Sequence, residues 1–104
     1  MNNYGVTDKF LIFVDSLIDQ FEHMLKENDF IDRDFTEEEA EKIRIDICNH
    51  VTCLDDWDDE IPCIEIYYYR DYSDNVQNIS IECNNCNTVI VDSEIFEYST
   101  EKDI

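Results

Sequence analysis

The hydrophobic period changes once along this chain, and that change decides which folds are open to it. Between residues 8 and 27, apolar side chains recur every three or four positions, a spacing that places them on one face of an α-helix. Beyond Pro62 they alternate with polar side chains instead, which is typical of strands with one buried face. Pro62 itself ends any helix that reaches it. The sequence therefore predicts helices first and strands last.

Two helices are predicted before Pro62. The first spans residues 8–27, and Thr7 is expected to cap its start. The second begins at a capping box, Thr36-Glu37-Glu38-Glu39, in which the Thr36 hydroxyl accepts from the Glu39 amide while the Glu39 carboxylate reaches back to the Thr36 amide. We expect this helix to run to about residue 54, with a buried face marked by Ala40, Ile43, Ile47, Val51 and Leu54.

Three strands are predicted after Pro62, at residues 63–69, 77–83 and 88–92, and residues 95–98 form either a short fourth strand or a continuation past a bulge. Asn84-Asn85 predicts a two-residue hairpin, because Asn tolerates positive φ. We expect the tail at 99–104 to fray. Residues 1–104 are thus predicted to form a single α+β domain, with two N-terminal helices packed on a three- to four-stranded antiparallel sheet.

The charge of the chain restricts its partners. Twenty-seven residues are Asp or Glu and seven are Lys or Arg, which gives a formal charge of -20. Such a surface repels nucleic-acid phosphates and anionic membranes, so neither is expected as a direct ligand. No secretory signal or membrane-spanning run is visible. The five cysteines are an odd number, which favours a cytoplasmic protein with thiols rather than disulfides.

Much of this charge is concentrated between residues 29 and 60, where thirteen acidic and three basic residues give a net charge of -10. Carboxylates one helical turn apart are separated by roughly 6 Å along the axis, which resembles the spacing of phosphates along a strand. Trp57, within the acidic loop that follows, either anchors a partner or packs across the end of the core. The predicted partner-binding residues are Glu37, Glu38, Glu41, Asp55, Asp56, Trp57, Asp58, Asp59 and Glu60.

These features predict a small inhibitor of a basic protein. A row of carboxylates that mimics nucleic acid would block the basic channel of a nucleic-acid-binding enzyme, and electrostatic attraction would speed the encounter. Phage-encoded anti-CRISPR and anti-restriction proteins share this general character. The alternatives are an immunity protein that neutralises a nuclease toxin, and a charge that only keeps the protein soluble. The sequence leaves both a monomer and a dimer open.

A second pattern concerns the cysteines. The segment around Cys83-Asn84-Asn85-Cys86 resembles one half of a zinc ribbon over about thirteen residues, with Asn87 where such knuckles favour Gly. A structural zinc site needs four ligands, and the others would come from Cys48, His50, Cys53 and Cys63. Two thiols beside a tight turn, with no cofactor, are the alternative. A zinc-stabilised adaptor module is therefore a third hypothesis for the function.

Catalysis is not indicated by the sequence. Cys48 and His50 are two positions apart on a helix and point to different faces, so they form no ready pair of nucleophile and base. A glycine-rich phosphate loop is absent, since Gly5 is the only glycine. Tyr67 and Tyr69 point to the same side of their strand, and they form an exposed aromatic pair if helices cover only the other side. We therefore expect a binding protein rather than an enzyme.

Overall fold

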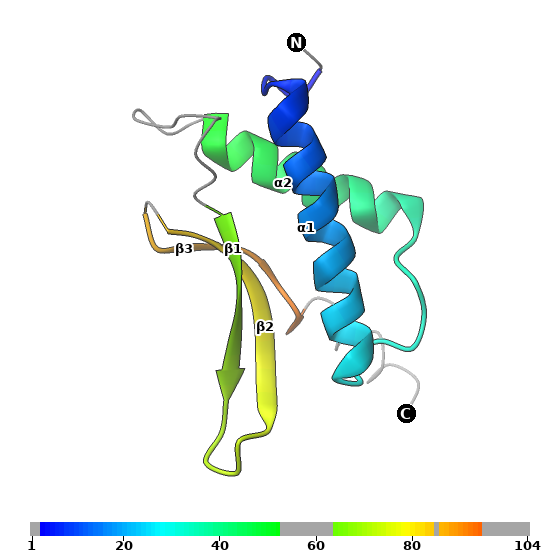
Figure 1. Ribbon diagram of the computed structural model, residues 1–104, viewed down its shortest axis with the longest axis vertical. Coiled ribbons are helices and arrows are strands. Elements are labelled where there is room, and N and C mark those ends of the chain that lie inside the picture. Colours follow the sequence, from blue (N-terminus) through cyan, green and yellow to red (C-terminus); the bar gives the residue numbers. More distant parts are fainter. Residues whose placement is uncertain (1–2, 53–63, 85, 95–104) are drawn as a thin grey trace.

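The computed structural model describes residues 3–52, 64–84 and 86–94 (Figure 1). Two helices, α1 (Asp8–Glu27) and α2 (Glu37–Thr52), precede three strands, β1 (Ile64–Arg70), β2 (Val76–Cys83) and β3 (Thr88–Asp92). The strands form an antiparallel sheet in the order β1-β2-β3. This α+β arrangement confirms the predicted fold class. Positions 53 and 54, the predicted fourth strand at 95–98 and the tail at 99–104 lie outside the described residues.

The first helix begins and ends as its sequence predicts. The Thr7 side-chain oxygen accepts a hydrogen bond from the Phe10 amide over 3.1 Å, which satisfies one of the amides left without a partner at a helix start. At the other end, the Asn28 side chain donates to the Met24 carbonyl over 2.8 Å. Asp29 then adopts a positive φ of 63°, a conformation that Asp tolerates better than most residues. These contacts direct the chain away from α1 and toward α2.

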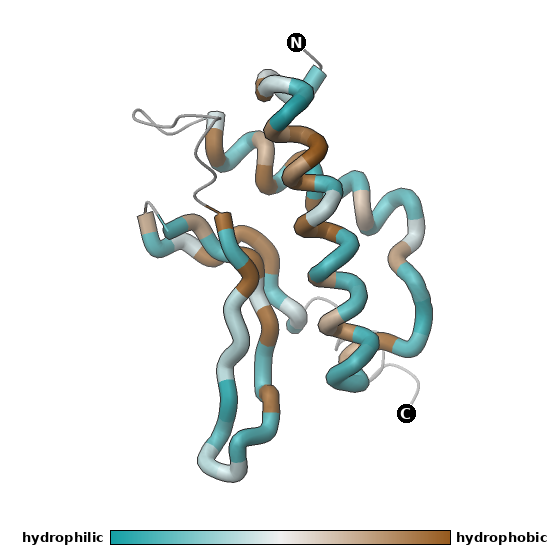
Figure 2. Tube along the Cα trace, in the orientation of Figure 1, coloured by the Kyte–Doolittle hydropathy of each residue, from teal (hydrophilic) through white to brown (hydrophobic). Residues whose placement is uncertain are grey.

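The apolar face of α1 forms the centre of the core. Phe10, Val14, Phe21 and Leu25 are each at most 1% exposed, whereas Ile12, on the opposite face, is 71% exposed. The two helices lie on one side of the sheet (Figure 1), with α2 crossing α1 steeply. Figure 2 shows apolar positions recurring along α1 and alternating with hydrophilic ones along β2. Helix and sheet thus bury the faces that their different periods define.

The sheet turns one face to the helices and leaves the other uncovered by either of them. Ile79 and Ile81 on the central strand are fully buried. On the other face Tyr69 is 45% exposed, and the Tyr67 hydroxyl donates to Glu65 over 3.1 Å. Tyr67 and Tyr69 therefore form the partly exposed aromatic pair that the sequence left open.

One expectation about the sheet is wrong. The connection between β2 and β3 has four residues, since Cys83 pairs with Thr88, and its described positive φ, 54°, belongs to Asn87 rather than Asn84. A two-residue turn of type I′ needs positive φ at both of its residues, and Asn84 does not provide it. On β1, Tyr68 is 44% exposed whereas Ile64, on the same face of the strand, is 2% exposed.

None of the helices in the described part of the chain has the length and the apolar character needed to cross a membrane.

The core position of Phe21 leads to a stability prediction. Truncation of a fully buried Phe leaves a cavity and removes apolar contacts, so Phe21→Ala should lower the free energy of unfolding by about 3–5 kcal/mol. Ile12→Ala, on the exposed face of the same helix, is the matched control and should change it by less than about 0.5 kcal/mol. Urea denaturation followed by circular dichroism measures both. Equal losses in the two variants would contradict the assignment of the buried face.

Candidate functional site

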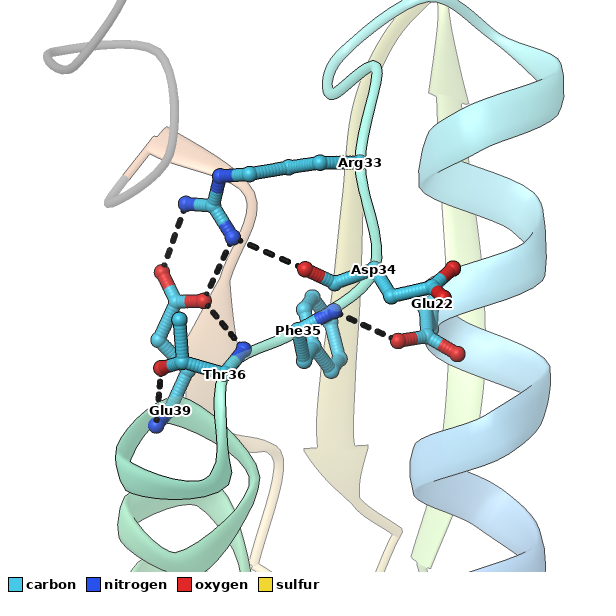
Figure 3. Close-up of polar contacts among 6 residues, drawn as sticks. All are labelled: Glu22, Arg33, Asp34, Phe35, Thr36 and Glu39. Atoms are coloured by element: carbon cyan, nitrogen blue, oxygen red, sulfur yellow. Dashed lines mark hydrogen bonds and ion pairs between the residues drawn. The ribbon is translucent and has the colours of Figure 1, made fainter.

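The connection between α1 and α2 is held in place by a network of hydrogen bonds (Figure 3). The Thr36 amide donates to Glu39 Oε1 over 2.9 Å, and the Glu39 amide donates to Thr36 Oγ1 over 3.1 Å. These two bonds confirm the predicted capping box. The Phe35 amide donates to Glu22 Oε2 on α1 over 2.6 Å. Since these contacts involve both helices, they fix the position of the first turn of α2.

Arg33 strengthens this network by binding the same glutamate. Its two terminal nitrogens donate to the two oxygens of Glu39 over 2.7 and 2.9 Å (Figure 3). Paired bonds of this kind are among the stronger hydrogen bonds in proteins. The Arg33 guanidinium, together with the Thr36 amide, lowers the pKa of Glu39 to about 2. The Glu39 carboxylate is therefore ionised at neutral pH and is bound by Arg33 and Thr36 of the same chain.

Most of the other cations also form ion pairs with carboxylates of the same chain. Among the described residues, five of the six lysines and arginines lie within 4.0 Å of an acidic side chain. Besides Arg33–Glu39, the ion pairs are Lys26–Asp34 at 2.6 Å, Lys42–Asp46 at 3.3 Å, Arg44–Asp15 at 2.7 Å and Arg70–Asp74 at 3.7 Å. Most of the positive charge is thus neutralised within the fold.

Several carboxylates have no such partner. Glu37 and Glu38, both predicted to bind a partner, are exposed on the first turn of α2. Asp29 and Asp32 are exposed on the connection that precedes it. Within the described chain, no lysine or arginine nitrogen lies within 4.0 Å of these four carboxylates. We call Asp29, Asp32, Glu37 and Glu38 the acidic edge. The sequence analysis did not single out the two aspartates, although the charge concentration from residue 29 onward included them.

Glu41, the third predicted residue on α2, has a different environment. Its two carboxylate oxygens accept from the Tyr4 hydroxyl over 2.9 and 2.7 Å, and Arg44 donates to the same carboxylate. These bonds lower the pKa of Glu41, with the Tyr4 bond contributing most. Arg44 also binds Asp15 on α1 over 2.7 Å. Only the contact within α2 could be expected from the sequence, because Tyr4 and Asp15 come from distant segments.

The second group of predicted partner-binding residues lies outside the described residues. It comprises Asp55, Asp56, Trp57, Asp58, Asp59 and Glu60. Their role stays a prediction from the sequence.

The structure also brings the predicted metal ligands Cys83 and Cys86 together with a histidine. His50 Nε2 lies 3.1 Å from Cys86 Sγ, and one ligand atom from each of the three side chains lies within 4.8 Å of the other two. The Thr88 hydroxyl, followed by the Cys83 side chain, lowers the pKa of Cys86. Burial instead raises the pKa of Cys48, which lies outside this cluster. Cys86 is therefore the more readily ionised thiol of the two.

No protein-family model matches this sequence, and searches among curated proteins and solved structures gave no match either.

The low pKa of Glu39 leads to a prediction about pH. Ionised Glu39 stabilises the fold above the ordinary carboxyl pKa of 4.5, and this contribution is lost as the pH falls toward about 2. Gln keeps the acceptor of the capping box but loses the charge. Glu39→Gln should therefore lower the free energy of unfolding by about 1 kcal/mol at pH 7, since a partly exposed ion pair is screened by solvent, and by little near pH 2.

Urea denaturation between pH 2 and pH 7 measures this difference. Glu38→Gln is the control, because Glu38 occupies the same turn without an arginine partner, and it should change stability by less than about 0.5 kcal/mol. A Glu39→Gln effect of constant size across this pH range would rule out the Arg33 contact as its cause.

Proposed function

We propose that this protein is an inhibitor that mimics nucleic acid and blocks the basic site of a nucleic-acid-binding enzyme in the cytoplasm. The enzyme is one of a defence system, as for anti-CRISPR and anti-restriction proteins. The acidic edge is part of the surface that the enzyme binds.

The distribution of charge is the observation that supports this proposal. Five of the six cations in the described chain contact carboxylates of the same chain, whereas the acidic edge presents its carboxylates to solvent. A charge needed only for solubility requires no particular arrangement. Here the cations are held in ion pairs, and the carboxylates of the acidic edge have no cation beside them. A basic partner can neutralise such a surface.

The framework beneath the acidic edge also favours binding. The capping box, the Arg33–Glu39 pair and the Glu22–Phe35 bond hold the connection and the first turn of α2 in one conformation. A surface that is ordered before binding loses less conformational entropy when the partner arrives.

A charge-removal variant tests the role of the acidic edge. Asp29→Asn, Asp32→Asn, Glu37→Gln and Glu38→Gln together change the formal charge from -20 to -16. The control removes the same charge elsewhere through Asp8→Asn, Asp19→Asn, Glu65→Gln and Glu94→Gln, with Asp8 matching the first-turn position of Glu37. At about 0.5–1 kcal/mol for each exposed pair, the edge variant should bind the partner roughly 30- to 1,000-fold more weakly, and the control less than about tenfold.

The partner is first captured from nuclease-treated host lysate at low salt. It should elute as salt rises, and also when duplex nucleic acid is added at low salt, because both compete for the same basic site. Affinities of the variants are then measured by calorimetry. A partner that nucleic acid does not displace would contradict the mimic, and equal weakening by both variants would remove the acidic edge from the interface. A nuclease toxin as the partner would indicate an immunity protein.

The acidic loop is tested by the same assay. Asp55, Asp56, Asp58 and Asp59 replaced by Asn and Ser should abolish inhibition if the loop enters the basic site, as the sequence predicts. Circular dichroism confirms that this variant keeps its fold. Full inhibition by the folded variant would exclude the loop from the mechanism.

A further inference from the structure

Three side chains that are potential metal ligands meet where the end of α2 approaches the β2–β3 connection. His50 lies in the last turn of α2, Cys83 is the final residue of β2, and Cys86 belongs to the connection. Although His50 and Cys86 are 36 residues apart in the sequence, His50 Nε2 is 3.1 Å from Cys86 Sγ. In the described part of the chain, this is the only such cluster of three His, Cys, Asp or Glu side chains found.

The distances suit a single zinc ion. Zinc binds imidazole nitrogen at about 2.0–2.1 Å and thiolate sulfur at about 2.3 Å, so tetrahedral ligand atoms lie roughly 3.5–3.8 Å apart. The three ligand atoms here lie within 4.8 Å of one another, and the His50 Nε2–Cys86 Sγ separation is 3.1 Å, so the cluster is close to the size that a zinc site requires. Thiolate combined with imidazole selects zinc over the harder cations Mg²⁺ and Ca²⁺, which prefer oxygen.

The shape of the β2–β3 connection favours the same conclusion. Cys83 pairs with Thr88 across the base of the connection, so Cys86 lies two residues before a position that the sheet pairs with Cys83. Zinc-ribbon knuckles favour Gly after the second cysteine, and Asn87 stands there in this chain. Asn87 nevertheless adopts a positive φ of 54°, because Asn reaches the left-handed region more easily than most residues. The backbone after Cys86 therefore takes a conformation that Gly also adopts readily.

The burial of the three residues differs in a way that suits a structural site. Cys83 is 1% exposed, His50 is partly buried and Cys86 is exposed. The cluster thus lies at the boundary of the core, where an ion can enter from solvent and still bind a buried thiolate. Cys48, on the same helix as His50, is fully buried and takes no part in the cluster.

We propose that His50, Cys83 and Cys86 bind one zinc ion, which ties the end of α2 to the β2–β3 connection. A tetrahedral site has a fourth position, which these three ligands leave to another group. The ion closes a loop of more than thirty residues between His50 and Cys83, so it stabilises the native state relative to the unfolded chain. This site is independent of the acidic edge and of the proposed inhibitory function.

Metal binding by the whole chain tests the proposal. Protein purified with a reductant and without chelators should contain about one zinc per chain by elemental analysis. After removal of zinc, titration with Co²⁺ should give a tetrahedral d–d spectrum and a thiolate-to-cobalt charge-transfer band that saturate at one equivalent. Addition of Zn²⁺ should then abolish both bands and raise the melting temperature.

Variants assign the ligands. Cys86→Ser changes an exposed side chain and should lower zinc affinity by more than about 100-fold, beyond the loss typical of an outer-shell contact. His50→Ala should do the same. His23→Ala is the histidine control, since His23 on α1 pairs with Glu27, and Cys48→Ala is the thiol control on α2. Both controls should bind about one zinc per chain.

Three results would overturn the proposal. The first is wild-type protein that takes up less than about a tenth of an equivalent of zinc and gives no charge-transfer band with Co²⁺. The second is full metal binding by folded Cys86→Ser and His50→Ala variants. The third is a disulfide between Cys83 and Cys86, detected as a mass lower by two hydrogens, if metal binding does not return after this disulfide is reduced. The Co²⁺ spectrum of wild-type protein is decisive even if a variant fails to fold.

Discussion

Burial of the apolar face of α1 holds this fold together against the repulsion of its own surface. The chain carries a formal charge of -20, and like charges at this density oppose compaction. Phe10, Phe21 and Leu25 counter that repulsion because the core removes their apolar side chains from water. Salt and water screen exposed charges, whereas the removal of apolar surface from water keeps its strength. The acidic groups are tolerated because they lie outside a core built around one helix.

The few cations are placed where carboxylates would otherwise crowd the helices. Arg33 binds Glu39 at the start of α2, and Arg44 connects Glu41 on α2 with Asp15 on α1. The result is a molecule whose cations mostly contact its own carboxylates, while the acidic edge keeps carboxylates without such a partner. The proposed binding of a basic enzyme is consistent with this division, since the partner's cations would meet carboxylates that have no competing ion pair.

Local signals in the sequence predicted most of the fold. The stripe of α1, the Thr7 cap and the capping box at Thr36 each depend on neighbours within about four positions, and all three are confirmed. Apolar and polar side chains alternate in the segment that forms β2, and two of its apolar residues, Ile79 and Ile81, are fully buried. The pattern within β1 does not predict how exposed each of its side chains is. Tyr68 shares a strand face with Ile64, yet Tyr68 is 44% exposed and Ile64 is 2% exposed.

The candidate sites also differ in how far the sequence alone predicts them. Glu37 and Glu38 were identified from the charge run alone, and both are exposed. His50 was one of several candidate zinc ligands, and only the packing of α2 against the hairpin places it beside Cys86. The contacts of Glu41 with Tyr4 and of Arg44 with Asp15 cross 37 and 29 positions. A sequence pattern identifies residues that are able to ligate or bind, whereas tertiary packing selects among them.

The open sheet has a consequence for how copies of this protein meet one another. In the described sheet, β1 and β3 are the edge strands, and edge strands offer backbone groups to which another chain can add. At neutral pH, two copies of this protein repel each other because both carry a large negative charge, and this repulsion opposes such association. As the pH approaches the isoelectric point of about 4.1, protonation of the carboxylates removes that barrier. Acidic conditions therefore favour edge-to-edge association, and the charge guards the protein against aggregation only while it remains ionised.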